Sequence, residues 1–369
     1  MNKDTQQHRL KKAAPLLNSI ISVTASAAAA AICLAAQSEE PLETLIAFFI
    51  SPFTNTFYFG NMLDQASLIL LCAMGFILPA KAGFFNLGGE GQAYLASFIA
   101  VEFALLIPEF PQPFGLIAGC ILATLCSGLL GFISAFLKQF LGITELISTY
   151  LLSCALLPLI DYGVNDIFRD SSSNLMATPY TSEAWFFTSF WNPSTLNSSI
   201  FFTVIITALL FWMFKRTRYG YELGLTGNNR AFAQSQGIKV GLISVLALTF
   251  GAACHGLAGA FSVYGSRHYV YAGITSGLGW SGISAALIGR NHPLGAVFGA
   301  LFFAWMEAGG KAAMLQTSTS FDLSSIVQGI AFILITVDFF RQKRKGNMAY
   351  PRTQGFRFQQ AVYASRRCK

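Results

Sequence analysis

Long apolar stretches recur along the chain, and most of them are long enough to cross a lipid bilayer. A transmembrane helix needs about 20 consecutive apolar residues, and about ten stretches approach this length. Only 11% of the residues are charged, against roughly 25% in a soluble domain. The sequence therefore predicts an all-α, polytopic membrane protein with about ten transmembrane helices. We place these spans at 14–36, 62–81, 86–107, 114–137, 143–162, 198–214, 240–264, 281–289 with its flanks, 294–313 and 322–340.

One further apolar run, 42–58, is short and is interrupted by Pro52. Because proline breaks a continuous helix, we interpret this run as an interfacial or re-entrant segment. The basic segment before the first span resembles the start of a signal peptide. The apolar run that follows is longer than a typical signal sequence, so we expect a retained span, with cleavage after "AAQ" as the alternative.

The distribution of basic residues predicts the orientation, because short cytoplasmic segments retain Lys and Arg. With the N-terminus in the cytoplasm, all Lys and Arg residues except Arg169, Arg267 and Lys311 fall on the cytoplasmic side. We therefore expect both termini to be cytoplasmic, as the segment 1–13 and the basic tail 341–369. The transmembrane domain 14–340 then carries an outer loop at 163–197 and a cytoplasmic loop at 215–239. The net charge of +7 follows from this topology and does not indicate a nucleic-acid partner, while the tail is either solvated or in contact with membrane lipid.

The sequence offers no local basis for enzymatic chemistry. It has no phosphate-binding loop G-x-x-x-x-G-K-[ST], no H-E-x-x-H and no G-x-S-x-G. Its seven cysteines have no C-x-x-C spacing, and six of them fall inside predicted spans. We expect a protein that is not an enzyme and that has no cofactor and no metal site.

Charged residues inside the spans are informative, because each costs about 2.5–3.5 kcal/mol at the bilayer centre. Asp64 and Glu145 are expected in the first turns of their spans, where water reaches them. Glu90 and Glu307 lie deeper. Glu307 could be an acid in a transport pathway or could pair with a neighbouring helix, and we favour the pairing.

Glu90 belongs to a glycine-rich stretch, "GFFNLGGEGQ", at 83–92. Each glycine costs a helix about 1 kcal/mol relative to alanine. Asn86 is a good N-cap and Glu90 would fall in the first turn that follows. The stretch predicts a broken helix that restarts. Two placements of this stretch remain open. It either lines an internal path or a seam between helices, where other parts of the protein cover the irregular backbone, or it forms a tight turn on the cytoplasmic side.

The cytoplasmic loop 215–239 contains a short predicted helix. Asn228 or Asn229 can cap it, "RAFAQSQ" supplies about two turns, and Gly237 is placed as the glycine that follows its end. Such a helix suits docking into a groove of a soluble partner, although a long loop can also carry a merely solvated helix.

The stretch at 83–92 closely resembles the G-x-F-N-[IL]-G-x-E-G-Q hallmark of ATP-binding cassette importer permeases for nucleosides, simple sugars and branched-chain amino acids. The loop is similar to that family's coupling loop, G-x-N-x-x-A-A-x-x-x-G-I. Phe232 and Gly224 depart from it, since alanine and arginine are usual there. "GRNHP" and the glycine-rich residues around it resemble the nucleoside-type subgroup, and "ITELISTYLLSC" matches another shared stretch.

The resemblance implies a permease subunit of a bacterial inner-membrane importer, forming half of the translocation pathway. The implied substrate is a nucleoside or riboflavin, then a simple sugar. Implied partners are a soluble ATP-binding subunit that hydrolyses ATP, a second and different permease subunit, and a periplasmic or lipid-anchored substrate-binding protein. The pathway or hinge residues would be Asn86, Gly88, Gly89, Glu90, Gly91, Gln92 and Glu145, and the coupling-loop residues would be Gly227, Asn229, Phe232, Ala233, Gly237 and Ile238.

A secondary, ion-coupled transporter remains the alternative, because such proteins also contain broken helices near the middle of the membrane. That class typically has internal repeats, and the sequence shows no second copy of the 83–92 stretch. A membrane scaffold is a weaker alternative, since it would not need a polar hinge. Co-purification of an ATPase would separate the importer from both.

Overall fold

The computed structural model describes residues 20–21, 23–36, 38–317, 329–330 and 333. The predicted segment 1–13, most of the last predicted span at 322–340 and the basic tail 341–369 lie outside these residues. In the described part, the chain is helical, and its extended segments form only isolated bridges rather than strands. The prediction of an all-α protein is confirmed.

Within the part of the chain that the structure describes, six helices are long and apolar enough to cross a membrane. Two of them continue into a short, wider turn of helix, α7 into η1 (Gly163–Ile167) and α11 into η3 (Val263–Arg267). The six are α4 (Thr56–Lys81), α6 (Phe114–Leu141), α7 (Glu145–Tyr162), α8 (Ser199–Arg216), α11 (Val240–Ser262) and α13 (Pro293–Gln316).

Three other predicted spans correspond to helices that are either shorter or less apolar than these six. The first is Val23–Ala36, the second is α5 (Gly89–Leu106), and the third is α12 (Leu278–Ile288). α5 carries both Glu90 and Glu102, which lower its apolar character. A helix of 11 residues rises only about 16 Å at 1.5 Å per residue, so α12 by itself is about half the length that a bilayer requires.

The run 42–58 does not form a span of its own. It is divided into α2 (Pro41–Phe49), α3 (Ser51–Thr54) and the beginning of α4. The predicted start of α4 at residue 62 is wrong, because the Asn55 side chain accepts a hydrogen bond from Phe57 N and starts the helix at Thr56. Asp64 therefore lies roughly two turns inside α4, not in its first turn, and only 5% of it is exposed.

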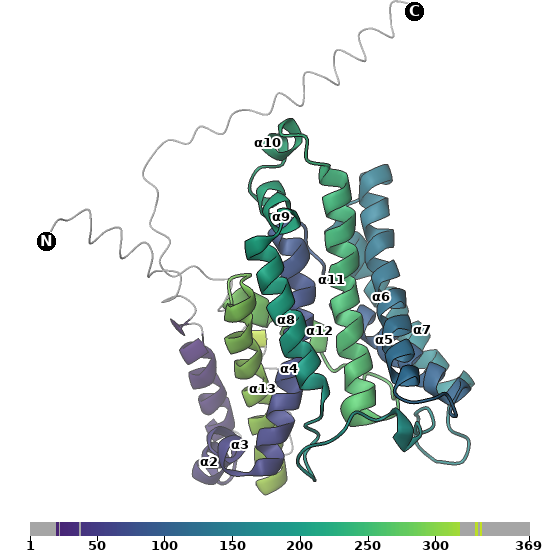
Figure 1. Ribbon diagram of the computed structural model, residues 1–369. Helices are drawn as coiled ribbons and strands as arrows, with labels where there is room; N and C mark the ends of the chain where they lie inside the picture. The colour runs from purple at the N-terminus through teal and green to yellow at the C-terminus, as the bar shows by residue number, and fades with distance from the viewer. Residues whose placement is uncertain (1–19, 22, 37, 318–328, 331–332, 334–369) are drawn as a thin grey trace, which may run out of the picture. The chain divides into compact units, whose positions relative to one another are not determined.

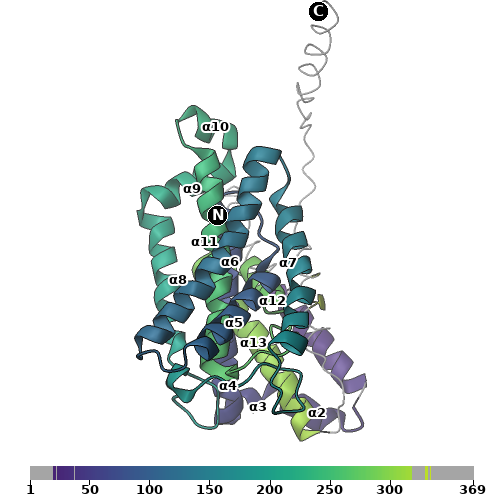
Figure 2. The same ribbon diagram turned by 90° about the vertical axis from the view of Figure 1, so that its right-hand side faces the viewer.

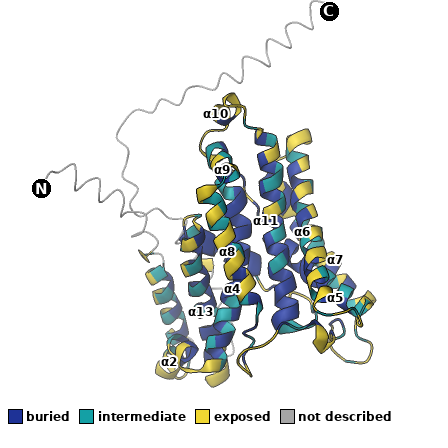
Figure 3. Cartoon of the chain, viewed as in Figure 1, coloured by how far each residue is buried: buried dark blue, intermediate teal, exposed yellow. Residues whose placement is uncertain are grey.

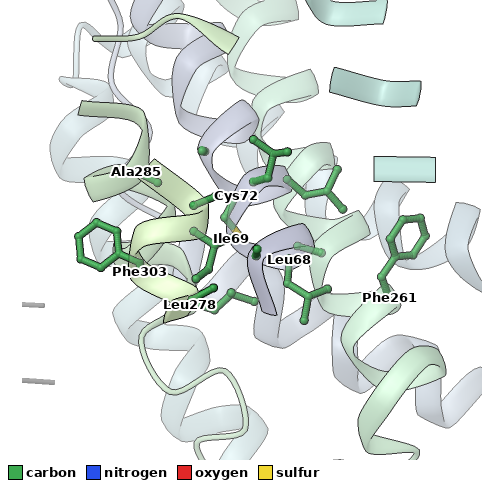
Figure 4. Close-up of a cluster of buried hydrophobic side chains, with 14 of the residues drawn as sticks. Leu68, Ile69, Cys72, Phe261, Leu278, Ala285 and Phe303 are labelled. Carbon is green, nitrogen blue, oxygen red and sulfur yellow. The ribbon is translucent and has the colours of Figure 1, made fainter. Parts of the chain in front are cut away.

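α4 is the central helix of the bundle. Figure 4 shows its side chains Leu68, Ile69 and Cys72 among residues from three other helices. These are Phe261 of α11, Leu278 and Ala285 of α12, and Phe303 of α13. In contrast, α8 presents large apolar residues to the surroundings (Figure 3), as expected for a helix that faces lipid.

The two long connections of the bundle lie at opposite ends (Figure 1). The loop 215–239 folds into α9 (Arg218–Asn228) and α10 (Arg230–Ser235), which project beyond the long helices (Figure 2). The connection 163–197 contains the short helical turn η2 (Glu183–Trp185) and lies at the other end. The expectation of one short helix in the loop 215–239 is incomplete, because its first half is helical as well: Thr217 caps α9 by accepting from Gly220 N.

Candidate functional site

The break between α4 and α5 is the first part of the candidate site, and we call residues 82–88 the hinge. Gly83 has φ +78°, a left-handed conformation that glycine adopts without strain. The predicted break and restart are confirmed, and Glu90 lies in the first turn of α5 as expected. The predicted N-cap is wrong: Gly88 occupies that position without a side-chain cap.

Asn86 instead holds the hinge together from the inside. Its side chain is fully buried, and its Oδ1 accepts from Gly88 N at 3.0 Å. Asn86 and Gln92 also form a reciprocal amide pair, with Asn86 Nδ2 donating at 2.8 Å and Gln92 Nε2 donating at 3.1 Å. Because buried amides are costly when unpaired, this pairing fixes the path of the chain into α5.

The hinge packs tightly against α7. Thr149 Oγ1 accepts from Leu87 N at 3.1 Å, and Ser153 Oγ accepts from Gly91 N at 2.7 Å. A Cβ on Gly91 would lie 2.6 Å from Ser153 Oγ, and one on Gly88 would lie 2.7 Å from the Thr149 carbonyl oxygen. Gly88 of the hinge and Gly91 of α5 therefore permit a close helix seam, which is one of the two placements that the sequence left open.

Glu90 connects the beginnings of α5 and α12. Its carboxylate accepts from Gly277 N at 2.9 Å and from Gly279 N at 2.8 Å. A Cβ on Gly279 would overlap Glu90 N and lie 2.6 Å from the Gly89 carbonyl carbon. The first N–H groups of a helix lack partners within the helix and favour negative charge. Glu90 thus caps α12 from the first turn of another helix.

The hinge also contacts the loop 215–239. A Cβ on Gly227 would overlap the Lys81 carbonyl oxygen and lie 3.0 Å from Gly83 N. Next to this contact, the ring of Phe84 lies 4.4 Å from Lys138 Nζ and 5.7 Å from the guanidinium carbon of Arg230 in α10. The structure therefore brings together two groups of predicted residues that are far apart in the sequence.

Glu145 is joined to this site only indirectly. It is buried at the start of α7 and forms an ion pair with Lys138 of α6. Lys138 also faces the ring of Phe84. The carboxylate of Glu145 thus has a cationic partner that holds the ends of α6 and α7 together.

The second half of the loop has a well-defined helix. Asn229 Oδ1 accepts from Phe232 N at 3.0 Å, which confirms one of the two predicted caps. Gly237 has φ +79°, Ile238 N donates to Ala233 O at 3.1 Å, and Gly237 N donates to Gln234 O at 3.0 Å. These bonds form a Schellman motif, with Gly237 in its predicted place. The helix has six residues, close to the two turns expected.

The side chains of this helix divide between the loop and the surroundings. Ala233 is buried, whereas 48% of Phe232 is exposed. Cationic groups gather at the same end of the bundle. Partial burial, with Lys81 and Lys215 nearby, lowers the pKa of His292, which precedes α13. This end therefore presents an aromatic side chain among positive charges.

Two buried groups were not singled out from the sequence. His255 of α11 lies against the start of α5, where a Cβ on Gly89 would be 2.6 Å from its Nε2, and its Nδ1 pairs with Gly251 O at 3.1 Å. Glu102 of α5 has an Oε1 atom that is buried without a hydrogen-bond partner among the described residues. A lone histidine in an apolar run gave no sequence pattern that would mark His255. Glu102 is a charged residue within the predicted span 86–107, and the rule that marked Glu90 could have found it.

Glu307 lies between two polar partners. Its carboxylate accepts from Gln65 Nε2 of α4 at 2.8 Å and from Lys311 Nζ at 2.8 Å. Lys311 is one turn further along α13. The expected pairing with a neighbouring helix is confirmed through Gln65.

Comparisons with known proteins show which family the chain belongs to. The family model described as "Branched-chain amino acid transport system / permease component" matches residues 58–336. The chain belongs to this family of transport permeases. Together with six long apolar helices, membership makes it a multi-pass membrane protein, which in bacteria lies in the inner membrane.

Several curated relatives cover most of the chain. A probable riboflavin import permease protein of Treponema pallidum is 31% identical over 328 residues, which are 88% of this chain and 86% of the relative. A nucleoside ABC transporter permease protein of Lactococcus lactis is 25% identical, with 84% and 87% covered. A guanosine ABC transporter permease protein of Bacillus subtilis is 22% identical, with 89% and 95% covered.

These relatives favour the importer permease over the secondary transporter. The family is one of permease components, which agrees with the lack of enzymatic motifs in the sequence. No solved structure matches the chain.

Proposed function

We propose that the chain forms half of the translocation pathway of an ATP-binding cassette importer for a small ring-bearing solute. Riboflavin or a nucleoside is the proposed substrate class, ahead of a simple sugar. Support comes from the names of the riboflavin and nucleoside permeases that cover more than four fifths of the chain.

The single observation that carries a mechanism is the contact between Gly227 and the Lys81–Gly83 turn. A soluble ATP-binding subunit would dock on α10 around the exposed Phe232 and move the loop. Because the packing at Gly227 leaves no space, the hinge must follow this movement. The hinge leads directly into α5, whose first turn carries Glu90, and Glu90 holds the start of α12. Work done at the loop would therefore reach the inside of the bundle.

The same proposal assigns the other partners. A second permease subunit, different in sequence, would complete the pathway, and a periplasmic or lipid-anchored protein would deliver the solute to the connection 163–197. Alternating access would then be a rigid-body movement between the two permease halves, biased by ATP binding.

We propose a topology of ten crossings with both termini in the cytoplasm. In this topology, the hinge and α5 together cross the membrane outward as one interrupted span. Residues 268–277 and α12 together cross it inward as another. This assignment is supported by the contact between the first turn of α5, at Glu90, and the first turn of α12, at Gly279. Irregular backbone within a membrane is tolerated where protein covers it, and Asn86 and Thr275 are both buried.

Topology can be tested with single cysteines in a cysteine-free background. Cysteine at Asn174 in the connection 163–197 should react with a membrane-impermeant maleimide in intact cells. Cysteine at Ser235 of α10 should react only after the cells are opened. The reverse pattern would overturn the orientation.

The function is tested by purifying the chain together with the proteins that accompany it. ATPase activity is then measured with nucleosides, riboflavin, simple sugars and branched-chain amino acids. We expect stimulation by one ring-bearing ligand. If no ATPase accompanies the chain, the importer proposal fails and the secondary transporter becomes the better explanation.

A further inference from the structure

A second polar region lies at the end of the bundle opposite α10. It is a cavity of about 410 Å³, within the usual range of about 300–1,000 Å³ for small-molecule sites. We call it the tyrosine cavity. The start of α4, the end of α13, the connection 163–197 and residues 266–271 form its walls.

One wall of the tyrosine cavity is aromatic. The ring centroids of Tyr180 and Tyr269 are 4.4 Å apart, and those of Tyr269 and Tyr271 are 5.7 Å apart. Tyr180 is 60% exposed. The three rings therefore form a continuous surface, of which at least one ring remains open to a ligand.

Backbone pairing holds this wall in place. Ala177 and Tyr271 form an antiparallel bridge, Thr178 N donates to Val270 O at 2.9 Å, and Thr181 N donates to His268 O at 2.9 Å. Because residues 177–181 pair with residues 268–271 in this register, Tyr180 lies beside Tyr269. The aromatic surface is thus built by two connections that are remote in the sequence.

The facing wall consists of hydrogen-bonding groups on α4. Asn61, Asp64 and Gln65 line the cavity, and their spacing of three and four residues places them on one helix face. Asp64 Oδ2 accepts from Thr195 Oγ1 and Oδ1 accepts from Asn197 Nδ2, each at 3.0 Å. A carboxylate has roughly four acceptor positions, so Asp64 can accept further hydrogen bonds from a ligand.

Two basic residues complete the lining, Arg267 and Lys311. Arg267 donates to Tyr271 Oη, and its guanidinium carbon lies 6.0 Å from the Tyr271 ring centroid. Lys311 is paired with Glu307, but 57% of its side chain is exposed. The cavity therefore offers donors as well as acceptors, next to a stacking surface.

We propose that the tyrosine cavity binds the imported solute on its way to the hinge, and that it selects a planar heteroaromatic ring carrying a hydroxylated chain or sugar. This inference rests on the proposed import function. The ring stacks on Tyr180 and Tyr269, while Asp64, Asn61 and Gln65 bind the hydroxyl groups. A simple sugar lacks the aromatic ring that would stack on the tyrosines, and a branched-chain amino acid lacks the hydroxyl groups that the side chains of α4 would bind.

A second cavity of similar size lacks this combination of walls. This second cavity of about 400 Å³, between α6, α8 and α11, is lined almost entirely by apolar residues such as Leu116, Ile121 and Phe202. It offers no comparable set of hydrogen-bonding side chains. A solute with both a ring and several hydroxyl groups therefore matches the tyrosine cavity.

The test uses direct binding to the purified complex in detergent without ATP. Riboflavin is titrated up to millimolar concentration and followed by quenching of its own fluorescence, and adenosine binding is measured by competition. Stacking of a base on an aromatic side chain is worth roughly fivefold to a hundredfold in affinity. Tyr180→Ala and Tyr269→Ala are each expected to weaken binding at least about fivefold.

Matched variants separate the cavity from general damage. Tyr180→Phe and Tyr269→Phe keep the rings and should retain most of the affinity. Tyr162→Ala removes an exposed tyrosine of α7 that does not line the cavity, and it should bind like the unaltered protein. Ribitol should compete more weakly than riboflavin, because it has the hydroxyl groups but no ring.

The outcomes distinguish this inference from the import function. If ring-bearing ligands stimulate the ATPase but both alanine variants bind with unchanged affinity, the cavity assignment is overturned and the import function stands. If riboflavin and adenosine do not bind at all, the cavity assignment is also overturned. If binding depends on both tyrosines but no ATPase accompanies the chain, the cavity stands and the importer mechanism is the part that fails.

Discussion

Gly227 of the loop 215–239 packs so closely on Gly83 and Lys81 that a Cβ on Gly227 would overlap the Lys81 carbonyl oxygen. The two glycines are far apart in the sequence, yet their backbones pack directly against each other and connect the loop to the hinge. From Gly83 the chain continues through the buried Asn86 to Glu90, which holds the start of α12. A displacement of the loop thus has a continuous packed route to a junction between two helices.

Gly227→Ala tests this route. Adding a methyl group to a fully packed site costs about 1–3 kcal/mol, so the loop and the hinge should separate. We expect substrate-stimulated ATPase activity and uptake to fall severalfold. Gly224→Ala is the matched control, because no atom lies within 4 Å of its Cβ position. Equal activity of the two variants would show that the Gly227 contact does not transmit the movement.

Glu90→Leu tests the junction between α5 and α12. The change removes two charge-assisted hydrogen bonds, each worth roughly 1.5–3 kcal/mol, and leaves the N–H groups of Gly277 and Gly279 without this acceptor. We expect uptake to be lost while the protein still inserts, with Glu90→Gln intermediate because it keeps one acceptor oxygen. Glu43→Leu, at an exposed glutamate of α2, should transport normally. Normal uptake by Glu90→Leu would remove Glu90 from the transport mechanism.

Gly237→Pro tests the proposed docking of the ATPase on α10. Proline fixes φ near −65°, whereas Gly237 has φ +79° and donates its N–H to Gln234 O. The end of α10 should therefore unwind. We expect ATP hydrolysis to become uncoupled from uptake, with insertion and delivery of the solute unchanged.

The control for this change is Gly237→Asn, since asparagine tolerates a positive φ and retains its N–H. It should stay coupled. Both activities are measured on the same purified complex reconstituted in vesicles. If the proline variant couples ATP hydrolysis to uptake as well as the asparagine variant does, the shape of the end of α10 has no part in docking.

Lys138→Met tests whether Glu145 belongs to the pathway or to the framework. Removing one partner of a buried ion pair costs up to about 3–5 kcal/mol, and less here because 21% of the Lys138 side chain is exposed. We expect a lower melting temperature in detergent. The double variant Lys138→Met with Glu145→Gln should regain stability, because no unpaired charge remains.

Uptake by the double variant then decides the role of Glu145. Retained uptake would assign Glu145 to the framework that joins α6 and α7. Lost uptake in a protein of normal stability would support the predicted place in the pathway. If Lys138→Met alone has the same melting temperature as the unaltered protein, the ion pair between Lys138 and Glu145 does not contribute to stability.

Local features of the fold could be predicted from the sequence. The insertion of a helix into a membrane depends on the apolar residues of that segment, so α4, α6, α7, α8, α11 and α13 were recognisable one at a time. Helix ends also depend on neighbouring residues, and the Asn229 cap and the Gly237 turn were predicted for this reason. The same holds for the break at the hinge.

What the sequence by itself determined, therefore, was the membrane class of the protein, its breaks and caps, and the family resemblance. The tertiary structure alone decided that Asn86 pairs with Gln92 instead of capping α5, that Glu90 caps a helix start 187 residues further along the chain, and that Tyr180 lies beside Tyr269. A hydrogen bond or ring contact between distant segments depends on how whole helices pack, and no local pattern of residues specifies that packing.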